Sequence, residues 1–177
     1  MSTVIWITGL SGAGKTTLAR EVLAYLKALN HCTVLLDGDE LREVLGTEVF
    51  YPSAYDRAVR LELALRYSRL CRLLSLQGCV VVIATVSLFR EVHTWNRANL
   101  PSYFEVYLKV PIEELRRRDP KGIYERFDAG ELTNLAGLDL PIDEPEAADW
   151  SIDFDPQRSV RQLAEELLRR LKERKVV

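Results

Sequence analysis

The chain has 177 residues, of which 24 are Lys or Arg and 26 are Asp or Glu, giving a formal net charge of -2 at pH 7. This length predicts one domain, residues 1–177, with enough material for a sizeable hydrophobic core. The balanced charge argues against nucleic acid as a partner, and no apolar stretch approaches the length of a membrane span, which argues against a membrane.

Short β-branched runs alternate with longer amphipathic segments along the chain. In chain order this alternation predicts strands at 3–8, 33–37, 79–85, 103–109 and 151–154, separated by helices at 15–29, 39–45, 56–77, 88–98, 112–117 and 158–175. Four of the strands are apolar almost throughout, as expected of strands that helices cover on both faces. The sequence therefore predicts an α/β fold, a three-layer α/β/α sandwich with a mostly parallel five-stranded sheet.

A glycine-rich loop joins the first predicted strand to the first predicted helix. Eight of its residues fit the pattern G-x-x-x-x-G-K-[ST] without a mismatch, which is typical of the phosphate-binding loop of P-loop NTPases. Backbone N–H groups of such a loop point at phosphate oxygens, while Lys15 can reach the outer phosphates and the Thr16 hydroxyl can ligate Mg²⁺. The expected nucleotide-binding residues are Gly9, Leu10, Ser11, Gly12, Ala13, Gly14, Lys15, Thr16 and Thr17.

Two carboxylates, Asp37 and Asp39, follow directly after the second predicted strand. Ligands of parallel α/β sheets bind beyond the carboxyl ends of the strands, where the phosphate-binding loop also lies. One carboxylate could hold Mg²⁺ through water, and the other could orient or deprotonate an attacking hydroxyl group. The alternative is that both merely cap the following helix. Their combination with the loop favours a catalytic site.

The stretch 119–149 lacks a strong hydrophobic period and contains several residues that break helices and strands: Pro120, Gly122, Gly130, Gly137, Pro141 and Pro145. We expect a long surface excursion, and because phosphoryl transfer needs water excluded, a mobile lid over the nucleotide.

The cysteines Cys32, Cys71 and Cys79 form no C-x-x-C pair and have no histidines at ligand spacing. Neither a disulfide framework nor a zinc site is expected, which favours a reduced, cytoplasmic setting. The predicted C-terminal helix leaves homodimer formation open.

Several longer motifs resemble the adenylylsulfate kinase family over nearly the whole chain. They are W-I-T-G-L-S-G-A-G-K-T-T at 6–17, D-G-D-E-L-R at 37–42, D-R at 56–57, A-T-V-S-L-F-R at 84–90, and R-D-P-K-G-I-Y at 118–124 followed by A-G-E-L-T-N at 129–134. The resemblance implies an enzyme that transfers the γ-phosphate of ATP, with Mg²⁺, to the ribose 3′-hydroxyl of adenosine 5′-phosphosulfate. The implied partner is thus a small-molecule nucleotide acceptor.

Carried over by position, the resemblance implies roles for individual residues. Asp39 becomes the base or orienting carboxylate, Asp37 a magnesium-side partner, and Lys15 a catalytic cation. Arg118 and Lys121 belong to the lid, Arg118 towards ATP and Lys121 towards the acceptor. The remaining implied acceptor contacts are Arg42 and Arg57, and Ser87 matches a serine that some members phosphorylate on themselves. Arg60 and Leu135, where the chain departs from the family pattern, are further candidate acceptor contacts.

Departures from the family pattern gather in the acceptor half. After Arg57 the family continues with Asn and two arginines, whereas this chain reads Ala58-Val59-Arg60. The family also clamps the acceptor adenine between two phenylalanines. Near the first position stand Phe50, Tyr51 and Pro52, and at the second stands Leu135. Loss of one aromatic plate removes stacking worth about 1 kcal/mol or more.

Three readings follow. The chain is either a divergent adenylylsulfate kinase or a member of a related branch that phosphorylates another conjugate, such as cytidine diphosphoramidate in bacterial capsule synthesis. The third reading is a regulatory ATPase or nucleotide-binding switch without a small-molecule acceptor. The motifs D-G-D and R-D-P-K-G-I-Y oppose this reading, because they suit an acceptor site and a lid.

Overall fold

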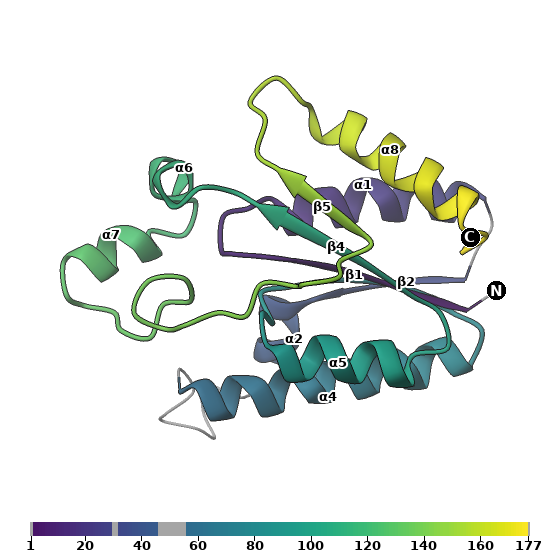
Figure 1. Cartoon of the computed structure of the whole chain (residues 1–177), viewed down its shortest axis with the longest axis horizontal. Helices are drawn as coiled ribbons and strands as arrows, with labels where there is room; N and C mark the ends of the chain where they lie inside the picture. Colours follow the sequence, from purple (N-terminus) through teal and green to yellow (C-terminus); the bar gives the residue numbers. More distant parts are fainter. Residues whose placement is uncertain (1, 30–31, 46–55, 177) are drawn as a thin grey trace.

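The computed structural model describes residues 2–29, 32–45 and 56–176. Five strands form one sheet, and every neighbouring pair in it is parallel (Figure 1). In chain order they are β1 (Thr3–Gly9), β2 (Thr33–Asp37), β3 (Val80–Thr85), β4 (Tyr103–Lys109) and β5 (Trp150–Asp153). Their order across the sheet is β2-β3-β1-β4-β5, so the strand that carries the glycine-rich loop is central. The predicted five-stranded sheet is confirmed.

Helices cover both faces of the sheet. On one face lie α1 (Lys15–Ala28) and α8 (Val160–Glu173), and on the other lie α2 (Gly38–Val44), α4 (Arg57–Leu76) and α5 (Arg90–Asn99). The two remaining helices, α6 (Ile112–Arg118) and α7 (Ile123–Asp128), extend beyond one end of the sheet (Figure 1). This arrangement confirms the predicted three-layer sandwich.

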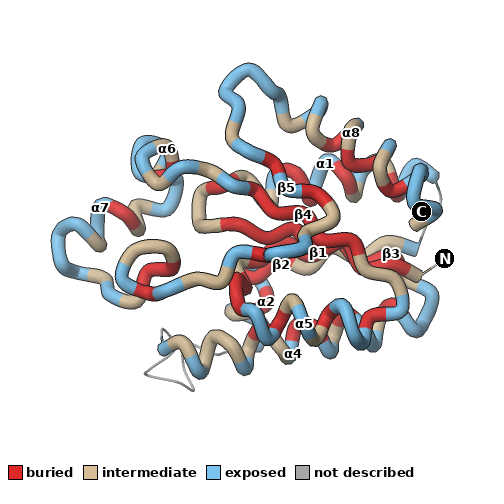
Figure 2. The backbone as a smooth tube through the Cα atoms, in the orientation of Figure 1, coloured by how far each residue is buried: buried red, intermediate tan, exposed pale blue. Residues whose placement is uncertain are grey.

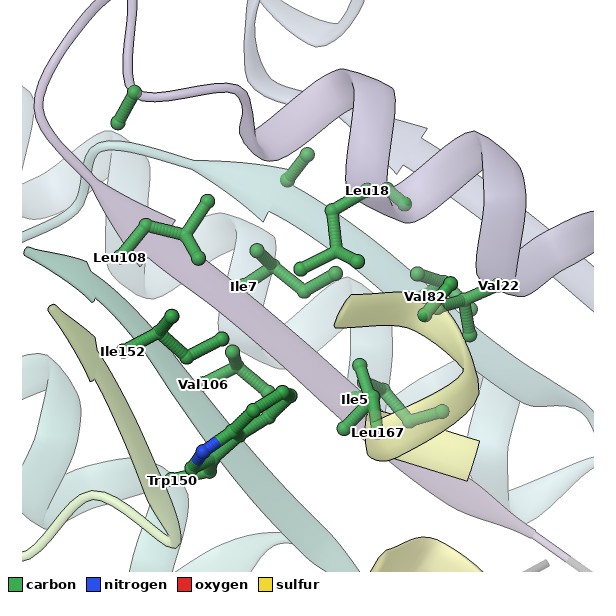
Figure 3. Packing of buried hydrophobic residues seen from close by; sticks show 14 of the residues in the cluster. Ile5, Ile7, Leu18, Val22, Val82, Val106, Leu108, Trp150, Ile152 and Leu167 are labelled. Carbon is green, nitrogen blue, oxygen red and sulfur yellow. The ribbon is translucent and has the colours of Figure 1, made fainter. Parts of the chain in front are cut away.

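The central strand supplies both halves of the hydrophobic core. Side chains of a strand alternate between faces, so Ile5 and Ile7 pack under α1 and α8, while Val4 and Trp6 pack under α4 and α5. All four side chains are fully buried, and Figure 2 colours β1 as buried along most of its length. Figure 3 shows Ile5 and Ile7 among side chains of neighbouring strands and helices. Burial of each such side chain contributes about 1.5–3 kcal/mol, which fixes the sheet beneath the loops that follow its strands.

The excursion at 119–149 has more internal structure than the sequence indicates. It contains α7, which begins where the side chain of Asp119 accepts backbone hydrogen bonds from Ile123, Tyr124 and Glu125. Tyr124 is almost fully buried, and so are Leu135 and Leu140 further along. The segment is therefore anchored to the core at several points, and its mobility as a lid stays a prediction.

Among the helices of the described ranges, none combines the length and apolar character needed to cross a bilayer.

Candidate active site

A cavity of about 860 Å³ opens at the carboxyl ends of the strands. Its wall includes the loop after β1, the start of α2 after β2, residues 84–89 at the end of β3 and residues 152–155 at the end of β5. Helix α4 and the excursion at 119–149 complete the wall. The cavity lies where parallel α/β sheets bind their ligands, as the sequence predicts.

Glycines shape the loop between β1 and α1. Gly12 and Gly14 adopt left-handed backbone conformations, with φ of 80° and 92°, which other residues adopt only with strain. Gly14 is the residue that precedes α1, so the positive end of the helix dipole faces the loop. Residues 11–17 line the cavity, whereas Gly9 packs closely against Leu108. This loop is thus built to receive an anion.

Lys15 is half-buried beside this loop, and its Nζ donates a hydrogen bond of 2.8 Å to the carbonyl oxygen of Leu10. Burial, and then the positive charge of Lys121, lowers the pKa of Lys15 to about 7, while the Asp37 carboxylate acts in the opposite direction. The environment of the ammonium group is therefore short of negative charge, which the phosphates of a nucleotide would supply.

Thr16 and Asp37 meet on the cavity wall. The Thr16 hydroxyl donates a hydrogen bond of 2.6 Å to Asp37 Oδ2, while Asp37 Oδ1 accepts the backbone N–H of Asp39 at 2.9 Å. Asp37 thus caps α2 with one oxygen and faces Thr16 with the other, so the two sequence interpretations of this residue are compatible.

This oxygen pair fits Mg²⁺, which takes one or two protein ligands and completes its shell with water and substrate phosphates. Across residues 2–29, 32–45 and 56–176 there is no cluster of three or more His, Cys, Asp or Glu side chains that could hold a metal by themselves. A metal here would therefore share its coordination with a ligand.

Asp39 stands at the first turn of α2, with its carboxylate half-exposed to the cavity. It forms ion pairs with Arg42 on its own helix and with Lys121 from the lid segment. All three residues line the cavity. The carboxylate predicted to face the acceptor hydroxyl is thus held between two cations. One of them, Lys121, lies 82 residues from Asp39 in the sequence.

The lid segment is tied to the loop. The Tyr124 hydroxyl donates a hydrogen bond of 2.9 Å to the carbonyl oxygen of Ser11. Arg118 lines the cavity, with its guanidinium 4.8 Å from the centre of the Phe154 ring and 3.5 Å from the Gly12 carbonyl oxygen. Phe154 was missed from the sequence, although its position directly after β5, at the carboxyl end of the sheet, could have indicated it.

The opposite half of the cavity is largely apolar. Its wall is formed by residues of α4 and of two loops: Val59, Leu63, Tyr67, Phe89, Leu135 and Ile142. Tyr67 and Phe89 were missed from the sequence, since they also fit the pattern of core residues. Arg60 and Leu135, which the sequence analysis names as candidate acceptor contacts, both line the cavity, and Leu135 is only 7% exposed. The first phenylalanine position of the family clamp, near residues 50–52, lies outside the described residues.

Arg57 is not among the described residues that line the cavity. Its guanidinium donates to Asp143 Oδ2 at 3.1 Å, pairs with Glu91 and lies 5.3 Å from the centre of the Phe89 ring. The pKa of Asp143 is lowered, first by the backbone N–H of Arg90 and then by Arg57. The structure thus places Arg57 behind the wall formed by Phe89, and its predicted contact with an acceptor would require a new side-chain position.

Ser87 lines the cavity and is buried, with its hydroxyl 2.8 Å from that of Thr85.

The sequence and structure match proteins of known family. A model of the adenylylsulphate kinase family matches residues 1–153. A cytidine diphosphoramidate kinase of Campylobacter jejuni is 37% identical over 168 residues, which cover 95% of both chains. A probable adenylyl-sulfate kinase of Archaeoglobus fulgidus is also 37% identical, over 88% of this chain and 97% of its own. The structure of the Mycobacterium tuberculosis APS kinase CysC in complex with AMPPNP and APS has a TM-score of 0.87 at 32% identity and covers 97% of this chain and 98% of that one.

Proposed function

This chain belongs to the adenylylsulphate kinase family and is a nucleotide kinase that phosphorylates a hydroxyl group, and on that premise we propose that it transfers the γ-phosphate of ATP to the ribose 3′-hydroxyl of a nucleotide conjugate. The proposal is supported by one observation above all. A single cavity is lined by four of the proposed functional residues: Lys15, Thr16, Asp37 and Asp39. Lys15 supplies a cation for the phosphates, Thr16 and Asp37 supply metal ligands, and Asp39 supplies a carboxylate for the acceptor.

On the donor side, the loop N–H groups and Lys15 would bind the phosphates of ATP. Thr16 and Asp37 would hold Mg²⁺, which neutralises the charge that develops on the phosphate oxygens. Arg118 would lie beside the nucleotide, because it borders the cavity next to Gly12. Arg118 is held there by Glu114, whose pKa is lowered to about 2 by hydrogen bonds from Arg117 and Arg118.

On the acceptor side, Asp39 would orient the attacking hydroxyl and accept its proton as the bond to phosphorus forms. Lys121 and Arg42 now occupy the oxygens of Asp39, one on each. We expect an acceptor phosphate to draw these cations towards itself, since Arg and Lys bind phosphate more favourably than an exposed carboxylate. That exchange would free Asp39 for the hydroxyl.

As the acceptor we propose a pyrimidine conjugate of the cytidine diphosphoramidate type. Two observations support this choice: the aliphatic Leu135 on the cavity wall offers little stacking surface for a purine, and the Campylobacter kinase matches this chain over nearly its full length. Adenylylsulfate is the second candidate. It is supported by the relatives named adenylyl-sulfate kinase and by the CysC structure that contains APS.

The test is acceptor-dependent release of ADP, measured in a coupled assay with cytidine diphosphoramidate, adenylylsulfate and simple nucleoside mono- and diphosphates. We expect turnover with the cytidine conjugate, and Lys15→Ala should lower it by several orders of magnitude. Lys27→Ala, on the exposed end of the same helix, is the matched control. Strong preference for adenylylsulfate would overturn the acceptor assignment. ATP turnover that no acceptor accelerates would overturn the kinase mechanism and favour a regulatory ATPase.

A further inference from the structure

Two cysteines lie side by side at the end of the sheet away from the cavity. Cys32 directly precedes β2 and Cys79 directly precedes β3, and these strands are neighbours with Thr33 opposite Val80. The backbone N–H of Val80 donates a hydrogen bond of 2.8 Å to the carbonyl oxygen of Cys32. The two sulfur atoms are 3.2 Å apart. The pair is 47 residues apart in sequence, so spacing alone does not reveal it.

The backbone geometry suits a covalent bond between these sulfurs. Neighbouring strands lie about 4.8 Å apart, inside the range of roughly 4.4–6.8 Å that disulfides span between Cα atoms. Residues opposite each other in a parallel pair project to the same face, and the 3.2 Å contact between the sulfur atoms shows that both thiols do so here. Closure from 3.2 Å to a bond of about 2.05 Å needs a shift of roughly 1 Å, within reach of a side-chain rotation.

The two thiols differ in exposure. Cys32 is exposed and Cys79 half-buried. The hydrogen-bonding contact with Cys32 raises the pKa of Cys79. Because Cys32 is the more exposed of the two, it is the thiol that an oxidant in solution meets first. The third cysteine, Cys71, offers an internal contrast, since it is fully buried in the core and burial raises the pKa of its thiol well above the usual range.

We propose that Cys32 and Cys79 are a modification site at which a hydroperoxide forms a reversible intramolecular disulfide. The Cys32 thiolate attacks the peroxide O–O bond, giving a sulfenic acid and releasing the alcohol, or water when the oxidant is hydrogen peroxide. The Cys79 thiolate then attacks the sulfenic sulfur and releases water. Two thiols have lost two electrons and two protons, and the peroxide has been reduced.

The proposed disulfide would link the edge strand β2 covalently to its neighbour β3. Within residues 2–29, 32–45 and 56–176, β2 has a neighbouring strand on one side only, and it carries Asp37 at its far end. Cys32 lies roughly 16 Å from Asp37, taking about 3.3 Å for each of the five residue-to-residue steps along β2. Figure 1 shows β2 beginning on the side of both chain termini, opposite α6 and α7. We therefore expect the disulfide to stabilise the fold without entering the cavity.

The test compares the full chain after hydrogen peroxide and after dithiothreitol. Peptide mapping under non-reducing conditions should find Cys32 and Cys79 in one cross-linked peptide that lacks two hydrogens, and dithiothreitol should reverse it. Cross-linking should raise Tm by roughly 5–10 °C. Cys32→Ser should abolish both the cross-link and the Tm shift. Cys71→Ala should keep both, because it leaves the pair intact.

Three outcomes would overturn the proposal. In the first, excess peroxide converts Cys32 to higher oxides without any cross-link. In the second, the cross-link joins two copies of the chain, as a size shift on non-reducing gels would show. In the third, the linked monomer forms equally well in Cys32→Ser, which would assign the bond to other cysteines.

Discussion

Lys15 makes nucleotide binding dependent on pH. In the empty protein its pKa is lowered from 10.5 to about 7, chiefly by burial. That difference means that the protein environment destabilises the ammonium form of Lys15, relative to water, by roughly 5 kcal/mol. A bound triphosphate supplies the missing negative charge, so we expect the complex to restore a high pKa for Lys15. Nucleotide binding should then take up a proton wherever the empty protein holds neutral Lys15.

The size of the effect follows from the pKa. At pH 8, about nine-tenths of the empty protein would carry neutral Lys15, so binding takes up close to one proton; at pH 6 the uptake falls to about one-tenth. Above about pH 7.5 the affinity for Mg²⁺-ATP should fall roughly tenfold for each further pH unit. The terminal phosphate, with a second pKa of about 6, is already ionised in this range and contributes little to the slope.

Isothermal titration calorimetry with a non-hydrolysable ATP analogue measures the uptake. At pH 8, the binding enthalpy should vary with the ionisation enthalpy of the buffer, and the slope counts the protons. Lys15→Arg, permanently charged, should bind with no such slope. Lys121→Arg keeps the neighbouring positive charge without an amine that titrates there, so the uptake should remain. Buffer-independent enthalpy for the wild type, or an unchanged slope for Lys15→Arg, would refute the reasoning.

The lowered pKa of Lys15 also makes the free energy of unfolding of the empty protein depend on pH. Unfolded Lys15 binds its proton up to pH 10.5, whereas the folded empty protein releases it near pH 7. The unfolded state therefore binds more protons in this window, so the contribution of Lys15 to stability rises with pH between 7 and 10.5.

Three substitutions test the acceptor half. Asp39→Asn should lower kcat roughly a hundredfold while leaving ATP affinity intact, whereas Glu40→Gln, its exposed neighbour, should leave both unchanged; a collapse of ATP affinity in Asp39→Asn would instead mark a metal or structural residue. Arg57→Ala should raise KM several-fold for every accepted acceptor, and an unchanged KM would leave Arg57 as a partner of Asp143 only. Leu135→Phe should shift the ratio of kcat/KM for matched adenine and cytosine conjugates towards adenine by about tenfold, equal to about 1.4 kcal/mol, and an unchanged ratio would exclude stacking at this position.

Local patterns were sufficient to predict most of the fold. The βα alternation and the P-loop pattern predicted the five strands and six of the helices, because each depends on neighbouring residues alone. Helix α7 was missed, since its six residues are too few to show a period. The capping Asp119 ahead of it was the available signal.

Contacts between distant residues account for what the sequence did not predict. The partners of Arg57 come from positions 34 and 86 residues away, and one of the two cations that pair with Asp39, Lys121, comes from 82 residues away. Family resemblance could name Arg57 as an acceptor contact, but not indicate that Asp143 and Glu91 hold it behind Phe89. Such pairings depend on how loops from different strands meet, which neither periodicity nor motif spacing encodes.

The order of strands places one part of the site on a central strand and another part on an edge strand, which opens more readily. The phosphate-binding loop follows β1, which has a strand on each side, whereas Asp37 ends β2 and Asp39 follows it, and β2 has one neighbouring strand among the described residues. Backbone amides in a central strand exchange with solvent only when most of the domain opens, while those of an edge strand exchange through smaller local openings. Hydrogen exchange should therefore be slowest in β1 and faster in β2. Asp37 and Asp39 can then change position as the phosphate is transferred, while the phosphate-binding loop keeps its conformation.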